Sequence, residues 1–327
     1  MRSLSGVKPT GGLHIGNYFG AIRQFVELQE KYECYYFIAD YHTLNTHMDP
    51  ALLTKTTWDI VADYLALGLD PERSTIFLQS MVPEVAELTF LLSNITPMGL
   101  LQRAHSYKDQ IAKGLQPNHG LFTYPLLMAS DILLYDSNVV PVGKDQKQHL
   151  EITRDIAMKF NQEYGEEVFT LPDPLILESV AVVPGTDGQK MSKSYGNTIE
   201  MFAPAKQLKK QIMSIVTDAT SLEAPKDPDK CNVVALYKLF ADKTQVAAME
   251  ANYRAGNYGY GHAKMELHRA LLEYFGPMRE KREALTQDRA FITQVLEEGS
   301  RRARATAIKK IRKVKKIMGL VGDVYGK

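Results

Sequence analysis

The sequence predicts an α/β protein in which a parallel sheet with flanking helices precedes a smaller helical domain. Short apolar runs typical of buried strands alternate with helical patterns up to residue 197. The order of strand, short turn and helix favours parallel pairing of the strands. After residue 197 the strand-like runs end and helical periodicity dominates. We therefore expect a sheet domain at residues 1–197 and a helical domain at residues 198–327.

The composition is ordinary for a globular protein without a strong overall charge. The chain has 327 residues, 45% of them hydrophobic and 24% charged, and a net charge of +1. Any contact with nucleic acid must therefore come from a local patch. Two cysteines, Cys34 and Cys231, are too few for a disulfide framework or a cysteine-rich metal site. With no export signal and no long apolar run, we expect a cytoplasmic protein that does not enter a membrane.

The first predicted strand, at residues 3–6, leads into a glycine-rich turn at residues 7–17 and a helix at residues 18–31. Backbone N–H groups at such a turn and at the helix start can receive a phosphate. Gly16 would let a nucleotide base approach the backbone. His14 could donate a hydrogen bond to a phosphate oxygen as charge develops there.

The next elements are predicted as strand, helix, strand and helix at residues 34–40, 52–69, 74–79 and 85–95. Because the carboxyl ends of parallel strands face the ligand crevice, Asp40 and His42 are candidates to line it. A purely structural role for His42 is an equal alternative. The last of these helices is apolar enough to suit either the core or a subunit contact.

A helix begun by Pro125 is predicted at residues 124–135, with Tyr124, Met128 and Asp131 on one face. A carboxylate on an otherwise apolar face is costly unless a group donates to it. We therefore expect a ligand N–H or O–H to bind Asp131.

A further strand, glycine turn and helix are predicted at residues 139–142, at Gly143 and at residues 150–164. Asp145 could accept hydrogen bonds from ribose hydroxyls, and Gln146 could bind an amino group. Helix capping alone would also explain Asp145.

After loose strand-like patterns at residues 169–183, an irregular segment at residues 183–197 contains Lys190 and Lys193, two seryl hydroxyls and several glycines. Flexible lysines in a glycine-rich segment suit a mobile lid over a polyphosphate. The alternative is a solvated basic loop.

Helices are predicted downstream at residues 205–216, 232–240, 245–253, 261–285 and 288–318. The last contains a basic stripe that includes Arg301, Lys309, Lys310 and Arg312. Because the rest of the chain is nearly neutral, this stripe indicates a contact with nucleic acid, although a solvated surface remains the alternative.

Two phosphate-directed motifs, His14-Ile15-Gly16-Asn17 and Lys190-Met191-Ser192-Lys193-Ser194, occur in an order that resembles the class I aminoacyl-tRNA synthetases. Residues 11–21, 124–135 and 140–160 are similar to the bacterial tryptophanyl-tRNA synthetases. The similarity covers nearly the whole chain and is weaker in the helical part.

The resemblance implies a homodimer whose subunits have a Rossmann-like catalytic domain, here residues 1–197, and a helical domain that binds the tRNA anticodon, here residues 198–327. It implies that Mg-ATP and L-tryptophan form tryptophanyl-AMP and pyrophosphate, and that tryptophan is then transferred to the 3′ end of tRNA(Trp). The reaction needs no protein nucleophile, because the α-carboxylate attacks the phosphorus.

The resemblance also assigns residues to roles. The catalytic group would be His14, Asn17, Lys190 and Lys193. The ATP site would comprise Lys8, Thr10, Gly11, Gly16, Gly143, Asp145, Met191, Ser192 and Ser194. The tryptophan site would comprise Leu4, His42, Tyr124, Met128, Asp131, Val142 and Gln146, with Asp131 accepting the indole N–H. The tRNA contacts would be Arg301, Lys309, Lys310 and Arg312.

The sequence departs from the family at several positions. Many members have an aromatic residue in place of Leu4 and a glutamate in place of Lys144, so the wall opposite the indole lacks an expected ring. Some relatives hold an iron-sulfur cluster through several cysteines of the helical domain. Only Cys231 lies in that part of this chain, so we expect no cluster.

Three other functions are weighed against this one. A tyrosyl-tRNA synthetase would share the fold and the aspartate, but residues 128–131 and 143–149 resemble the tryptophan enzyme more. A small nucleotidyltransferase would not need the helical domain. A non-catalytic synthetase paralogue would be expected to lose the lid lysines or His14, and this chain has both.

Overall fold

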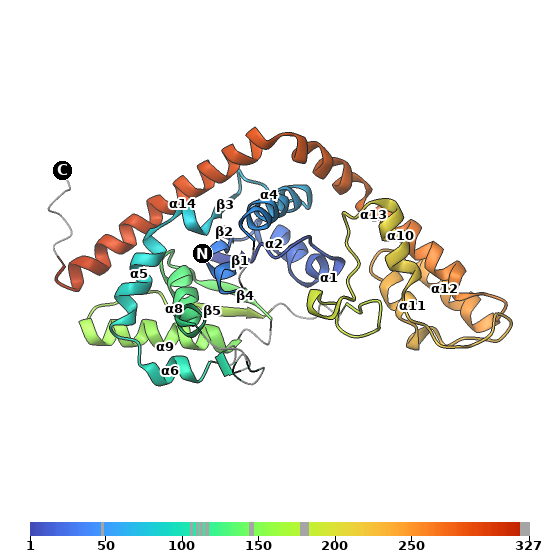
Figure 1. The fold of residues 1–327 in the computed structure, drawn as a ribbon, viewed down its shortest axis with the longest axis horizontal. Coiled ribbons are helices and arrows are strands. Elements are labelled where there is room, and N and C mark those ends of the chain that lie inside the picture. The colour runs from blue at the N-terminus through green and yellow to red at the C-terminus, as the bar shows by residue number, and fades with distance from the viewer. Residues whose placement is uncertain are drawn as a thin grey trace.

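The computed structural model describes residues 1–46, 49–104, 107, 108, 111, 114, 118–143, 147–176 and 183–320. Figure 1 shows a sheet with surrounding helices on one side and a group of helices on the other, with two long helices, α13 (Tyr260–Gln287) and α14 (Arg289–Ile317), forming an arch over the top. The predicted α/β fold, with a Rossmann-like parallel sheet and a helical C-terminal part, is confirmed.

The sheet has five strands in the order β3-β2-β1-β4-β5, and all its pairs are parallel. The strands are β1 Arg2–Val7, β2 Glu33–Ile38, β3 Ser74–Leu78, β4 Val139–Val142 and β5 Asp173–Ile176. The strand order reverses between β1 and β4. In open α/β sheets a ligand binds outside the carboxyl ends of the strands at such a point.

The helices of the first part are α1 Ile15–Asn17, a π-helical turn at Tyr18–Ile22, α2 Arg23–Leu28, α3 Asp40–Thr43, α4 Pro50–Ala66, α5 Glu84–Ser93, α6 Met98–Gln102, α8 His119–Leu133 and α9 Lys147–Tyr164. Those of the second part are α10 Ala205–Met213, α11 Asn232–Tyr237, α12 Lys243–Ala255, α13 Tyr260–Gln287 and α14 Arg289–Ile317. Within the described ranges, none of these helices combines the length and the apolar character needed to cross a membrane.

The start of α8 differs from the prediction. Pro125 lies inside the helix, which begins six positions earlier at His119. Asn118 caps the helix, because its Oδ1 accepts a hydrogen bond from the Leu121 N–H at 2.8 Å. This local cap, and not the proline, sets the first turn.

Both faces of the sheet are buried, as expected for parallel strands. In β2, Tyr36 and Ile38 join the apolar cluster that includes side chains of α2 and α4. The alternate residues Tyr35 and Phe37 join a second cluster with α5, α8 and α9. This alternation places Phe37 on the same face as Leu4 of β1, which belongs to the second cluster.

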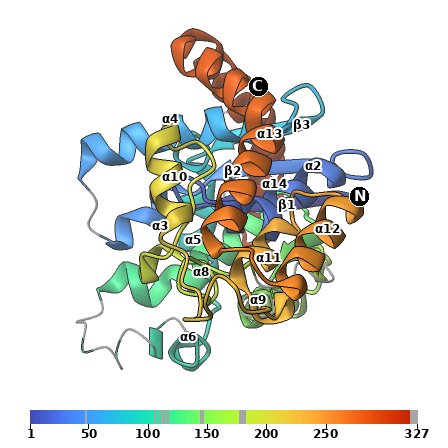
Figure 2. The ribbon, with the colours of Figure 1, turned by 90° about the vertical axis from the view of Figure 1, so that its right-hand side faces the viewer.

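The helices after residue 197 occupy two places. Helices α10 to α13 pack on one another beside the sheet domain (Figures 1 and 2). Helix α13 also reaches α4, where Arg282 forms an ion pair with the buried Asp63 and a second one, at 3.4 Å, with Asp59. Helix α14 turns back and packs along β3. The expected helical domain is therefore divided, because its last helix forms part of the packing of the sheet.

Helix α14 covers the edge strand β3 at very close range. A Cβ on Gly299 would lie 1.8 Å from the backbone oxygen of Ile76 in β3. On the N-terminal side of Gly299, Ile292 belongs to the apolar cluster that includes α2 and α4. On its C-terminal side, Ala303 belongs to the cluster with α5, α8 and α9. The helix thus joins the two cores and covers an edge that would otherwise expose unpaired backbone groups.

Replacing Gly299 by alanine should therefore destabilise the protein. The added methyl must push α14 away from β3, and we expect the free energy of unfolding to fall by about 3 kcal/mol, the upper range for overpacking. Urea denaturation followed by circular dichroism measures this change. The matched control is Gly261→Ala in α13, where no atom lies within 4 Å of the added carbon. Equal stability of the two variants would contradict the proposed close contact.

Candidate active site

The glycine turn after β1 is organised by His14. The His14 Nδ1 accepts a hydrogen bond from the Asn17 N–H at 3.3 Å, and the His14 N–H donates to Asn17 Oδ1 at 3.1 Å. This reciprocal pair forms a capping box at the start of α1. Because Nδ1 is an acceptor, a neutral His14 ring carries its proton on Nε2.

His14 is neutral at physiological pH. Burial, together with the positive charge of Lys193, lowers the pKa of His14 to about 4. A neutral ring with its proton on Nε2 can donate one directed hydrogen bond. The residue is therefore suited to stabilise an anionic oxygen without adding a full charge of its own.

The two-lysine segment contacts the glycine turn. Lys193 Nζ donates a hydrogen bond to the Gly11 oxygen at 3.0 Å. Next to it, the Ile15 N–H donates to the Ile199 oxygen at 3.0 Å. A Cβ on Gly16 would lie 2.9 Å from His14 Nδ1 and 3.3 Å from Met191 Cβ, so a side chain here would crowd residues of both motifs. The two motifs, far apart in the sequence, therefore form one site.

Asn197 holds the two-lysine segment in shape. Its Oδ1 accepts from the Ser192 N–H at 2.8 Å, and its Nδ2 donates to Asp187 Oδ1 at 2.7 Å and to the Lys190 oxygen at 3.1 Å. Ser192 and Ser194 share a hydrogen bond of 2.8 Å between their hydroxyls. The Lys190 side chain is exposed and free of these contacts.

A cavity of about 300 Å³ lies at the carboxyl ends of β1, β2 and β4, against α8. Six of the residues expected to bind tryptophan line it: Leu4, His42, Tyr124, Met128, Asp131 and Val142. Lys8 and Gly143, expected at the ATP site, line it as well. The predictions for Asp145 and Gln146 lie outside the described residues.

Asp131 is the buried acidic residue of this cavity, with an exposed fraction of 3%. Its Oδ2 lies 2.8 Å from His42 Nε2, and its Oδ1 accepts a hydrogen bond from Gln79 Nε2 at 2.7 Å. Burial raises the pKa of Asp131, and the hydrogen bonds from His42 and Gln79 oppose that rise. The carboxylate therefore already has two protein partners, which the sequence did not reveal, and keeps further lone pairs for a ligand.

Aromatic rings form much of the cavity wall. Tyr124 meets His42 edge-on at 5.4 Å between ring centroids, and Lys8 Nζ lies 5.3 Å from the centroid of the Tyr124 ring. Near Leu4, where a ring is lacking, the Phe37 ring lies directly over Gly6: a Cβ there would be 2.4 Å from Phe37 Cζ. Phe37 lines the same cavity. Strand alternation could have found this residue, because it shares a face with Leu4.

Comparison with known proteins gives the family. The family described as tRNA synthetases class I (W and Y) matches residues 1–276. The chain is a class I tRNA synthetase of the tryptophan and tyrosine group. A tryptophan–tRNA ligase of Fusobacterium nucleatum is 63% identical over 324 residues, which are 99% of each chain.

Solved structures of the family also match the fold of this synthetase. The tryptophanyl-tRNA synthetase of Campylobacter jejuni complexed with ADP and tryptophan aligns with a TM-score of 0.94 and 52% identity over 98% of this chain and 100% of that chain. The enzyme of Mycoplasma pneumoniae aligns with a TM-score of 0.79 and 29% identity over 98% and 97%.

Other predicted residues of the synthetase lie apart from the cavity. Thr10 is exposed in the glycine turn. Asp40 has a structural role, because its Oδ1 accepts hydrogen bonds from the Tyr41 N–H at 3.1 Å and the Ser80 N–H at 3.0 Å. It joins α3 to the turn after β3 and does not line the cavity that contains Asp131.

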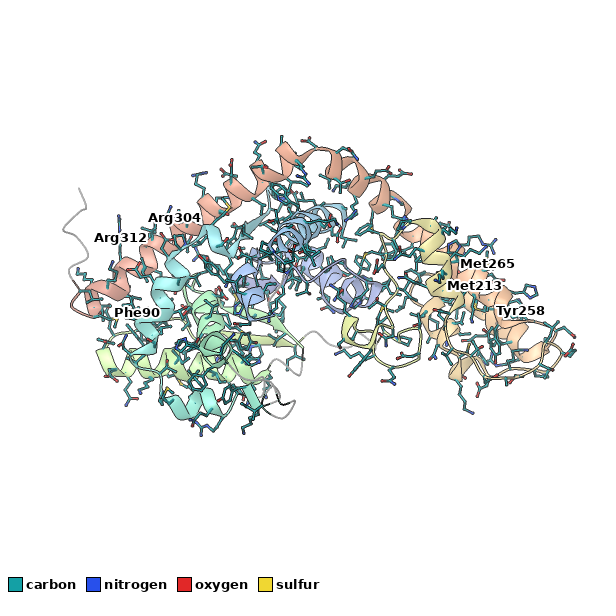
Figure 3. The ribbon with its side chains drawn as sticks, viewed as in Figure 1. Phe90, Met213, Tyr258, Met265, Arg304 and Arg312 are labelled. Carbon is teal, nitrogen blue, oxygen red and sulfur yellow. The ribbon has the colours of Figure 1, made fainter. Side chains whose placement is uncertain are left out.

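Most of the basic stripe on α14 holds that helix against the sheet domain. Lys310 is buried, with Nζ 2.5 Å from Asp136 Oδ1 and 2.6 Å from the Val168 oxygen. Arg304, labelled in Figure 3, pairs with Glu84 of α5 at 2.8 Å. Lys310 is therefore unavailable for the expected tRNA contact, because its charge is used in an internal ion pair.

The other three predicted tRNA contacts on α14 are exposed. Arg301 pairs with Glu298 at 2.7 Å on the same helix. Lys309 and Arg312 form no ion pair within the described residues, and Figure 3 marks Arg312 near the end of α14. Lys309 and Arg312 are therefore free to meet a polyanion, whereas Arg301 is exposed but already paired with Glu298.

The neutrality of His14 can be measured directly. In an NMR titration the His14 ring should protonate with a midpoint near pH 4. An unfolded histidine titrates at about pH 6.5, so between pH 4 and 6.5 the unfolded chain binds more protons than the folded one. His14 therefore makes the folded state less stable as the pH falls from 6.5 to 4. Lys193→Ala should raise the midpoint, since it removes a nearby positive charge. A midpoint near that of the unfolded ring would contradict this account. The resonance is assigned with His14→Gln.

Proposed function

We propose that this synthetase activates L-tryptophan with ATP, forming tryptophanyl-AMP and pyrophosphate, and transfers the tryptophan to the 3′ end of tRNA(Trp). The main support is one mostly apolar cavity that is lined by the buried Asp131 and by Lys8 of the glycine turn, together with the contact between that turn and Lys193. The names of the relatives from Fusobacterium nucleatum and Campylobacter jejuni support the same substrate. So do the ADP and tryptophan bound to the matching solved structure.

In the proposed first step, an oxygen of the tryptophan carboxylate attacks the α-phosphorus of ATP. A new bond forms between that oxygen and phosphorus, and the bond from phosphorus to the bridging oxygen breaks and releases pyrophosphate. The protein contributes positioning and charge stabilisation. His14 Nε2–H would donate to a phosphate oxygen, while Lys190 and Lys193 would neutralise the charge that develops on the leaving pyrophosphate.

Mg²⁺ would enter as part of Mg-ATP. Among the described residues, no group of three His, Cys, Asp or Glu side chains is arranged to hold a metal ion. The ion would then be held mainly by phosphate oxygens, as is usual for Mg²⁺ in nucleotide sites.

Tryptophan selectivity would depend on Asp131 and on the size of the cavity. The indole N–H would donate to a free lone pair of Asp131, while the ring packs against Leu4, Phe37 and Met128. A side chain without this donor would leave a buried lone pair unpaired, which is heavily penalised. A tyrosine hydroxyl could also donate to the carboxylate, but its smaller ring would fill less of the apolar space.

ATP–pyrophosphate exchange with each amino acid tests this proposal. We expect exchange with tryptophan to be much faster than with tyrosine, and Lys193→Ala to lower kcat by about 100- to 1,000-fold, as for loss of one charge-stabilising group. Lys206, an exposed lysine of α10, provides the control: Lys206→Ala should leave kcat unchanged. Faster exchange with tyrosine would assign the chain to the other specificity of its family.

We propose that residues 1–197 form the catalytic domain and that α10 to α13 form a unit that contacts the tRNA anticodon. Arg301, Lys309 and Arg312 on α14 would bind tRNA phosphates. Their exposure on a helix that is held firmly against the catalytic domain supports this role.

Removing two of these charges should weaken tRNA binding without slowing adenylate formation. For Lys309→Gln with Arg312→Gln we expect the slope of log affinity against log salt to fall by about one unit for each lost phosphate contact. Filter binding at several salt concentrations measures the slope. Lys31→Gln, an exposed site after α2, is the control. An unchanged slope would mean that these cations are only surface residues.

We also propose that the protein is a cytoplasmic homodimer. Phe90 of α5, labelled in Figure 3, is 70% exposed. Met98 of α6 is 62% exposed. Such exposure is expected for apolar side chains that a second subunit covers. Cys34 and Cys231 are both buried free thiols, which suits a reducing compartment.

A further inference from the structure

Gln79 lies directly after β3 and connects the two sides of the amino-acid cavity. The side chain is buried, with an exposed fraction of 1%. Its Nε2 donates to Asp131 Oδ1 at 2.7 Å, and its Oε1 accepts from the Tyr41 N–H at 3.1 Å. A buried amide with both ends bonded is held in a single orientation.

The backbone sets that orientation. The Tyr41 N–H can only donate, so the atom of Gln79 that faces it must be the carbonyl oxygen. The amide NH₂ is then directed at Asp131. An acceptor-only carboxylate is the matching partner for it.

The contacts close a ring through three elements. Tyr41 and His42 are neighbours on α3, Gln79 follows β3, and Asp131 belongs to α8. His42 Nε2 contacts one carboxylate oxygen and Gln79 Nε2 the other. With both oxygens held, the carboxylate plane cannot rotate, and the remaining lone pairs keep a constant direction. Since Asp131 lines the cavity, that direction decides where a ligand donor must sit.

We propose that Gln79 is a positioning residue for substrate specificity, which acts through Asp131 to aim the carboxylate at the indole N–H. This role depends on the proposed function, because it requires a substrate that donates to Asp131. Gln79 itself lies outside the set of residues that line the cavity, so it needs no contact with the substrate.

A purely structural role for Gln79 would have a different result. If the amide only joined β3 to α8, its loss would lower kcat/KM for every amino acid by the same factor. A positioning role affects only substrates that donate a hydrogen bond at this point. The useful measurement is therefore the ratio of kcat/KM for tryptophan to kcat/KM for β-(3-benzothienyl)alanine, in which sulfur replaces the indole N–H.

The first test is Gln79→Leu in ATP–pyrophosphate exchange. Leucine has a similar size but cannot donate to Asp131. We expect kcat/KM for tryptophan to fall by about 10- to 100-fold, the range for an unpaired buried polar group. The kcat/KM for the benzothienyl analogue and the KM for ATP should change little. An equal loss with both amino acids would overturn the proposal.

Gln29 provides a matched control. It is also buried, with an exposed fraction of 8%, and its amide bonds to the oxygens of Val26 and Gly68 and to the Asp70 N–H. It makes no contact with Asp131. Gln29→Leu should lower the melting temperature and leave the ratio of the two kcat/KM values unchanged. A change in ratio as large as that of Gln79→Leu would count against a specific role for Gln79.

Two further variants keep the test decisive if Gln79→Leu folds poorly. Gln79→Glu retains the acceptor for the Tyr41 N–H, but its carboxyl can donate to Asp131 only when it is protonated. The kcat/KM of this variant for tryptophan should therefore rise as pH falls. In the double variant of Gln79→Leu with Asp131→Asn, the ratio of kcat/KM for tryptophan to kcat/KM for the benzothienyl analogue should fall no further than in Asp131→Asn alone. A flat pH profile together with additive losses would refute the proposal.

The wild-type protein separates this inference from the proposed function. Absence of tryptophan-dependent exchange in the wild type would contradict both. Normal exchange in the wild type, with an unchanged ratio in Gln79→Leu, would contradict only the role of Gln79.

Discussion

The candidate site depends on one buried acidic side chain. A carboxylate with 3% exposure is tolerated only if donors surround it, and the donors to Asp131 come from α3 and from the residue after β3. The hydrogen bonds of Asp131 thus join three elements, α3, the turn after β3 and α8, next to the cavity. The proposed specificity of the site would depend on the same hydrogen bonds that join its walls.

The phosphate side of the site is built differently, from backbone and flexible side chains. The capping box of His14 and Asn17 fixes a short helix start, and burial next to Lys193 keeps the His14 ring neutral. The two-lysine segment contacts this turn through few bonds, and Lys190 is exposed. A fixed donor and cations on long, flexible side chains together suit a reaction in which negative charge moves from one phosphate to the next.

Helix α14 shows how a basic stripe can have two uses. The buried Lys310 and the exposed Arg304 pair with acidic groups of the sheet domain, while Gly299 lets the helix approach β3 closely. The outward cations remain exposed. A helix held by its own charges can therefore present others in a constant position relative to the catalytic site, which a separate, loosely attached domain could not do.

The sequence by itself determined the strands, the long helices, the order of the two phosphate motifs and the placement of Asp131 with Met128 on one helix face. These features depend on local periodicity and turn residues. The tertiary structure decided which distant groups meet: Gln79 with Asp131, the Phe37 ring over Gly6, and Lys310 with Asp136. Periodicity shows which face of an element is buried but not what lies against it, and the physical reason is that these contacts form only when the whole sheet assembles.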